Sequence, residues 1–172
     1  MVNMFSFSLA LFAIASVAES ANVQVVDFQN CSTDSTYVTF QNITISNAAL
    51  GQKAEVVVQG HLSTALDSNP TLETSLTTSY GLPLPCVSAI LQCHSELCGG
   101  TTQQELELNQ PWNNTCPITP GNYTMHLTVN LQGNVLTRLA FGNGSIIATV
   151  RVQDDGKTVG CVKFPVDIYM SP

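Results

Sequence analysis

The sequence predicts an all-β fold, an antiparallel immunoglobulin-like β-sandwich of about seven strands. In several segments apolar and polar residues alternate strictly, most clearly over residues 123–131. A period of two is typical of a strand with one buried face. Turn signals recur at regular spacing between these segments, and almost no helical pattern is present. The 172 residues suffice for one domain with a substantial core.

The first two predicted strands are short and differ in regularity. Residues 23–28 form an apolar strand that ends before Cys31. Residues 37–45 form the second strand, in which the apolar residues change parity between Phe40 and Ile43. A change of parity moves side chains to the other face of the sheet, so we expect a β-bulge at residues 41–42.

The third and fourth predicted strands differ in apolar content. Residues 54–62 alternate well, which predicts an inward row of Ala54, Val56, Val58, Gly60 and Leu62. Residues 67–70 have the composition of a turn. Residues 72–80 are rich in threonine and serine and predict only a weak strand.

Residues 81–116 depart from the strand pattern and hold four of the six cysteines. We interpret this stretch as a disulfide-stapled excursion at one edge of the sheets, with one or two helical turns within residues 87–97. Glu105 and Glu107 alternate in a polar run and predict a solvated edge.

The last three strands complete the predicted sandwich. The alternation over residues 123–131 predicts the first of them, and a row of Ile146, Ala148, Val150 and Val152 predicts the second. The Asp-Gly pair within residues 154–157 is a strong hairpin signal. The final strand, residues 158–169, has Val162, Phe164, Val166 and Ile168 on one face.

The start of the chain predicts a secretory signal. Residues 5–17 are apolar and small residues follow, so we expect residues 1–20 to be a signal peptide and residues 21–172 to be the domain. A membrane anchor is the alternative, but the apolar run is short for a bilayer span. Six cysteines, an even number, indicate three disulfides and an oxidising compartment.

Composition also indicates a secreted or lysosomal glycoprotein. Only 10% of the residues are charged, and the formal net charge is -7. Because basic residues are few and scattered, the composition argues against a nucleic-acid partner. Five sequons predict N-glycosylation at Asn30, Asn42, Asn113, Asn122 and Asn143.

The sequence offers no catalytic constellation, no cofactor motif and no metal site. His61 and His126 have the polar parity of their strands. Cys93, His94 and Cys98 do not have a common zinc-ligand spacing, and oxidised cysteines cannot bind zinc. We therefore expect a binding protein and not an enzyme.

Several motifs occur in a fixed order along the chain. They are Leu84-Pro85-Cys86 followed by Cys93 and Cys98, Cys116-Pro117 leading into Pro120-Gly121-Asn122-Tyr123-Thr124, and Asp155-Gly156-Lys157-Thr158-Val159-Gly160-Cys161-Val162-Lys163. In this order they resemble the ML (lipid-recognition) domain family. Within that family they are most similar to the ganglioside activator branch, the sphingolipid-presenting cofactors of lysosomal hexosaminidase.

The resemblance implies three disulfides, Cys31–Cys161, Cys86–Cys93 and Cys98–Cys116. It also implies splayed sheets with an apolar cavity for acyl chains between them. The inward rows would then supply the lipid-contacting wall, which is Val56, Val58, Leu62, Met125, Leu127, Val129, Ile146, Ala148, Val150, Phe164 and Val166. Periodicity alone does not distinguish this cavity from a closed core.

The segment 134–142 takes the place of the apolar membrane-facing loop of the activators. We predict that it is a docking loop, whose residues are Val135, Leu136, Arg138, Leu139 and Phe141. The alternative is that these side chains fold back under the loop as a satellite cluster.

Two classes of function remain open at this stage. In the first, the protein takes up a glycolipid, phospholipid or sterol, contacts membranes transiently, and presents the lipid to a hydrolase or receptor, with a lysosomal glycosidase as one candidate partner. In the second, it is a closed sandwich that serves as an adhesion, inhibitor or immune-recognition module. A carrier of small hydrophobic signals is a variant of the first.

Overall fold

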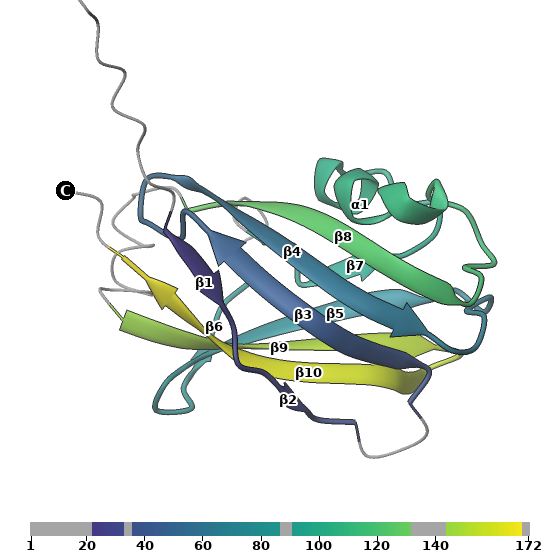
Figure 1. Cartoon of the computed structure of the whole chain (residues 1–172), viewed down its shortest axis with the longest axis horizontal. Coiled ribbons are helices and arrows are strands. Elements are labelled where there is room, and N and C mark those ends of the chain that lie inside the picture. Colours follow the sequence, from purple (N-terminus) through teal and green to yellow (C-terminus); the bar gives the residue numbers. More distant parts are fainter. Residues whose placement is uncertain (1–21, 33–35, 87–90, 132–143, 170–172) are drawn as a thin grey trace, which may run out of the picture.

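The computed structural model describes residues 22–32, 36–86, 91–131 and 144–169, which form two antiparallel sheets facing each other (Figure 1). The first sheet has the strand order β1-β3-β4-β8, and the second has the order β2-β10-β9-β5-β6, with β7 paired to β5. The strands are β1 (Val23–Val25), β2 (Gln29–Asn30), β3 (Val38–Ser46), β4 (Lys53–Leu62), β5 (Thr71–Thr78), β6 (Pro83–Leu84), β7 (His94–Glu96), β8 (Gly121–Asn130), β9 (Gly144–Asp154) and β10 (Lys157–Ile168). The prediction of an antiparallel all-β sandwich is confirmed, with ten strands in the described residues in place of about seven.

Alternation of side chains produces the inner faces of both sheets. Along β8 the odd-numbered residues are buried or partly buried, while Asn122, Thr124, His126 and Thr128 are exposed. The inward rows of β4, β9 and β10 follow the same rule. The period of two in the sequence therefore identified the faces that meet between the sheets.

The expected bulge lies in β3. Its register against β4 shifts between Phe40 and Asn42, which allows both Phe40 and Ile43 to face the interior. The first predicted strand, residues 23–28, is shorter in the structure. Only Val23–Val25 form strand β1, which pairs with β3, and β2 follows outside the predicted range and pairs with β10 in the other sheet.

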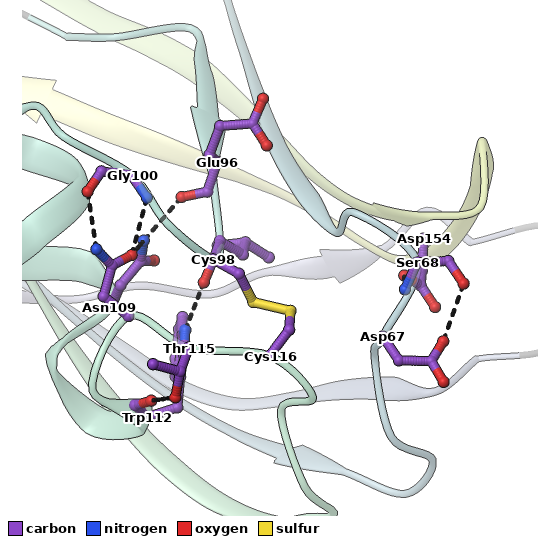
Figure 2. The surroundings of a disulfide bond; sticks show 12 residues. Asp67, Ser68, Glu96, Cys98, Gly100, Asn109, Trp112, Thr115, Cys116 and Asp154 are labelled. Carbon is purple, nitrogen blue, oxygen red and sulfur yellow. Dashed lines mark hydrogen bonds between the residues drawn. A yellow bond between two sulfur atoms is a disulfide. The ribbon is translucent and has the colours of Figure 1, made fainter.

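The weakly predicted fourth strand has a central position in the structure. β5 lies between β9 and β6, and eight of its residues are in register with β9. β9 on one side and β6 and β7 on the other supply its backbone with hydrogen-bond partners, so threonine and serine are tolerated in it despite their low apolar content. The turn at residues 67–70 and the β9–β10 hairpin meet where Asp154 Oδ1 accepts a 3.0 Å hydrogen bond from the Ser68 N–H (Figure 2).

The prediction of helical turns within residues 87–97 is wrong for its described part. Residues 94–96 form strand β7, and the helix α1 (Gln103–Leu108) lies further along the chain, followed by the 3₁₀ turn η1 (Gln110–Trp112). The reason is local. Thr102 and Glu105 form a capping box, in which each side chain receives a hydrogen bond from the other residue's backbone N–H, and this fixes where the helix begins. Helix α1 packs beside β8 (Figure 1).

Three disulfides are present, and they are the pairs that the family resemblance implies: Cys31–Cys161, Cys86–Cys93 and Cys98–Cys116. The first joins the chain after β2 to β10 across 130 residues of sequence. Chain-entropy reasoning gives a loop of that length a stabilisation of roughly 4–5 kcal/mol.

None of the helices in the described part of the chain has the length and apolar character that a membrane crossing requires. The predicted signal peptide lies outside the described residues.

Candidate functional site

The main feature of the interior is an apolar cavity of about 130 Å³ between the two sheets. The first sheet contributes wall residues from β3, β4 and β8, and the second contributes them from β5, β9 and β10. Thr74 is the only polar residue on this wall among the described residues. Such a cavity has no groups that could hold a polar ligand in place, so its chemistry fits hydrocarbon.

Most of the predicted lipid-contacting residues line this main cavity. Ten of them do so: Val56, Val58, Met125, Leu127, Val129, Ile146, Ala148, Val150, Phe164 and Val166. Leu62 does not, because it lies further along β4 in a second cavity. The structure brings the ten side chains together, and their contact with lipid stays a prediction.

Sequence reasoning missed part of the wall. Phe40, Ile43 and Ile45 reach it from β3, where the bulge makes the inward face hard to assign from parity. Leu72 and Leu76 reach it from β5, whose polar composition concealed its central place. The other wall residues outside the predicted set are Ala48, Thr74, Leu91, Leu108 and Leu131. Ala54, Val162 and Ile168 also line the cavity, and the alternation of their strands had placed them on the same faces as predicted wall residues.

A second, smaller cavity of about 50 Å³ lies further along the sandwich. Its wall is also mostly apolar and combines strand residues with residues of the stapled stretch. These residues are Val38, Phe40, Gly60, His61, Leu62, Leu66, Leu72, Leu97, Trp112, Ile118, Tyr123, Met125 and Val152.

A buried carboxylate, that of Glu105, holds together the disulfide-stapled residues 81–116 at this end of the sandwich. Glu105 is only 5% exposed, and its Oε1 accepts hydrogen bonds from the Glu96 N–H at 3.0 Å and from Gln92 Nε2 at 3.3 Å. Its Oε2 accepts bonds of 2.9 Å from the N–H groups of Thr101 and Thr102. One side chain thus joins β7 to the start of α1, and the prediction of a solvated edge at Glu105 is wrong.

These hydrogen bonds control the ionisation of Glu105. Burial raises the pKa of the carboxyl, but the bonds from Thr102, Glu96 and Thr101 outweigh burial and lower the pKa from 4.5 to about 2. The carboxylate therefore stays ionised in mildly acidic surroundings. Glu107 is partly buried, and its Oε2 accepts a 3.2 Å bond from the Thr128 N–H of β8.

Asparagines complete the network around α1 (Figure 2). Asn109 is fully buried, and its Nδ2 donates to the Glu96 carbonyl at 2.8 Å and to Asn114 Oδ1 at 2.9 Å. Asn114 also bonds in both directions with the backbone of Gly100. These bonds hold the segment from Trp112 to Cys116 against β7 and the start of α1.

Comparison with known proteins identifies the family. An ML domain model matches residues 25–168, most of the chain. The chain belongs to the ML domain family.

One solved structure agrees with this assignment at the level of the fold. A Niemann-Pick type C2 protein from the Japanese carpenter ant superposes on this ML domain with a TM-score of 0.53 at 15% identity, covering 83% of this chain and 98% of that chain. The C-terminal domain of Wzt has a TM-score of 0.48 at 7% identity, with 86% and 78% of the two chains covered. No curated protein matches the sequence.

The histidines of this ML domain lie apart from one another on its surface, and His61 also lines the second cavity. His61 Nδ1 is 2.9 Å from Asn122 Oδ1, and His126 Nδ1 is 3.3 Å from Glu55 Oε1, both on the exposed face of the first sheet. His94 Nε2 lies 3.5 Å from Glu96 Oε1. Among the described residues no group of three or more His, Cys, Asp and Glu side chains could hold a metal ion.

The predicted docking loop, Val135, Leu136, Arg138, Leu139 and Phe141, lies outside the described residues. The described surface of the ML domain carries a different apolar feature, at the turn between β5 and β6. Tyr80 is 92% exposed and Leu82 is 65% exposed, and the strands on either side of this turn pair at Leu76 and Leu84. Sequence reasoning did not single out this turn, although a tyrosine and a leucine around Gly81 were its signal.

Four of the five predicted glycosylation sites fall in described residues. Asn30, Asn113 and Asn122 are exposed and Asn42 is partly exposed, so a glycan on the first three would point to solvent. Asn143 lies outside the described residues. Use of these sites stays a prediction.

Proposed function

We propose that this ML domain is a non-enzymatic lipid carrier that takes up the acyl chains of a glycolipid, sphingolipid or other lipid between its sheets and presents the lipid to a hydrolase or receptor. Membership of the ML domain family supports lipid binding in general. The single observation that carries the proposal is the cavity of about 130 Å³ with an almost wholly apolar wall. A closed adhesion or inhibitor module would have no need of such a cavity, because most sandwiches pack their inner faces together.

The size of the cavity indicates how lipid would bind. Pockets that enclose a drug-sized ligand measure roughly 300–1,000 Å³. The cavity of this chain is smaller, so uptake of an acyl chain would spread the wall apart. Each buried methylene contributes about 0.8 kcal/mol, and a few of them already offset the cost of moving side chains.

Two surface features support transient contact with a membrane. The exposed Tyr80 and Leu82 extend from the hairpin of β5, whose Leu76 lines the cavity. The second is an expectation from the sequence, that the apolar segment 134–142, outside the described residues, is a docking loop. Apolar side chains that are exposed together mark contact sites on soluble proteins.

The three disulfides and the predicted signal peptide support a secreted or lysosomal location, because disulfides persist in oxidising compartments. The identity of the head group stays open between glycolipid, phospholipid and sterol. A lysosomal glycosidase is the hydrolase partner that the activator resemblance suggests.

A vesicle transfer assay tests the proposal. Donor vesicles carry a fluorescent ganglioside, phospholipid or sterol, and acceptor vesicles carry none. The proposal predicts that the protein accelerates transfer of at least one of these lipids, and that a ganglioside in vesicles becomes a better substrate for a hexosaminidase when the protein is added. Absence of transfer for all three lipids would contradict the proposal.

A further inference from the structure

The two cavities of the sandwich are neighbours. Phe40, Leu72 and Met125 line both of them, so these three side chains form the partition between the cavities. Phe40 and Met125 come from the first sheet and Leu72 comes from the second. The partition therefore crosses the space between the sheets and divides one apolar interior into two compartments.

The partition consists of side chains that can move without breaking polar contacts. All three are apolar and only partly buried. Met125 is the most adaptable, because an unbranched thioether side chain has three rotatable bonds and fills irregular gaps. A change of Met125 to another staggered rotamer would remove its part of the partition.

The far end of the second cavity is built differently, because polar contacts and a covalent bond hold it. Trp112 Nε1 donates a hydrogen bond to the Leu97 carbonyl. The Trp112 ring lies edge-on to the Tyr123 ring, with ring centroids 5.7 Å apart. The Cys98–Cys116 disulfide links the residue after Leu97 to the chain that follows Trp112. The second cavity thus has an adaptable wall towards the main cavity and a fixed wall at its other end.

From this arrangement we propose that the second cavity is a subsite for the terminal methylenes of a long acyl chain, with Phe40, Leu72 and Met125 as the partition that only a long chain displaces. The inference rests on the proposed lipid-binding function and deepens it to chain-length selection. Along β4, Val58 lines the main cavity and Gly60, two residues further, lines the second, so the chain end must travel roughly 7 Å further to reach the subsite. Short chains would remain in the main cavity.

Trp112 is the only tryptophan of the chain and reports on this subsite directly. Bromine quenches tryptophan fluorescence on contact, so the probes are palmitic acid brominated at its terminal carbon, palmitic acid brominated beside its carboxyl group, and octanoic acid brominated at its terminal carbon. We expect the first probe to quench Trp112 and the other two to leave it unquenched. Binding of each probe is measured separately by displacement of a fluorescent fatty acid.

Equal quenching by the two bromopalmitic acids, or none by the terminally brominated one while it is bound, would overturn the inference. Failure of every fatty acid to bind would instead contradict the proposed function. The two failures are therefore distinguishable in the same experiment.

A pair of variants on one face of β9 provides an independent test. Val150 lines the main cavity, and Val152, two residues further along, lines the second. Val152→Phe should lower the affinity for behenic acid relative to lauric acid by about tenfold, the effect of excluding two methylenes. Val150→Phe should weaken both acids alike. Identical ratios for Val152→Phe and the unsubstituted protein, both folded by circular dichroism, would contradict the inference.

Discussion

A substitution that fills the main cavity should lower the affinity for lipid without lowering the free energy of unfolding. Ala148 is 5% exposed and lines the cavity from β9, and Ala148→Phe adds one phenyl ring at that point. An engineered apolar cavity of about 150 Å³ in another protein admits a benzene molecule. The cavity of about 130 Å³ in this chain is thus close to the size of the added ring.

The two expected effects have opposite signs. Residual cavity volume costs about 24 cal/mol per Å³, so filling the cavity could raise the free energy of unfolding by up to about 3 kcal/mol. Strain from overpacking removes about 1–3 kcal/mol of this gain. The variant should therefore be at least as stable as the unsubstituted protein. The added ring also occupies volume that the acyl chain of a lipid would fill. Excluding three methylenes at about 0.8 kcal/mol each lowers the affinity about fiftyfold.

The assay combines displacement of a fluorescent fatty acid with urea unfolding. Gln59→Phe is the matched control, because Gln59 is exposed on β4 next to the cavity residue Val58 and places the same ring in solvent. We expect the control to bind lipid normally. An Ala148→Phe variant that is folded and binds lipid with unchanged affinity would refute the reasoning that the ligand occupies this cavity.

Three further predictions follow from the network at α1, the long-range disulfide and the apolar surface. Because hydrogen bonds lower the pKa of Glu105 from 4.5 to about 2, its ionised carboxylate stabilises the fold by about 3 kcal/mol at a pH above 4.5, and this stabilisation is lost as the pH falls from 4.5 through 2. Glu105→Gln should therefore be less stable than the unsubstituted protein in urea unfolding at neutral pH. Equal stability of the two proteins would contradict the role of Glu105. Peptide mapping of unreduced protein should link Cys31 to Cys161, and replacing both with serine should cost roughly 4–5 kcal/mol; another partner for Cys31 would contradict the fold. Lipid extraction from anionic vesicles should be faster at about pH 5 than at neutral pH, because proton uptake reduces the net charge of -7 and its repulsion. Two double variants should each slow extraction without unfolding the protein: Leu136→Ser with Phe141→Ser, and Tyr80→Ser with Leu82→Ser. An extraction rate that changes neither with pH nor in either double variant would mean that neither segment docks on the membrane.

The sequence predicted the strands with one buried face because their alternation depends only on local geometry. β4, β8, β9 and β10 are examples, as is the bulge in β3. β5 was underestimated because its stability comes from pairing with β9 and β6, which depends on residues far away in the chain. The early end of the first strand at Val25 is likewise a tertiary effect, because the chain leaves β3 there and pairs with β10 of the other sheet from Gln29 on.

The site could be predicted in part, for a related reason. Periodicity identifies which side chains face inward, and most of the predicted wall residues line the cavity. The distance between the sheets, which decides whether inward residues form a core or a cavity, depends on packing across the whole sandwich. Helix α1 is different, since its capping box of Thr102 and Glu105 was visible in the sequence and could have located it.

Native mass spectrometry of protein purified from its secreting host, followed by organic extraction, tests the central claim most directly. The proposal predicts a bound species of lipid mass that organic solvent removes, and that the Ala148→Phe variant purified in the same way lacks. Protein that carries no lipid, and that takes up none from vesicles, would contradict the account of this ML domain as a lipid carrier.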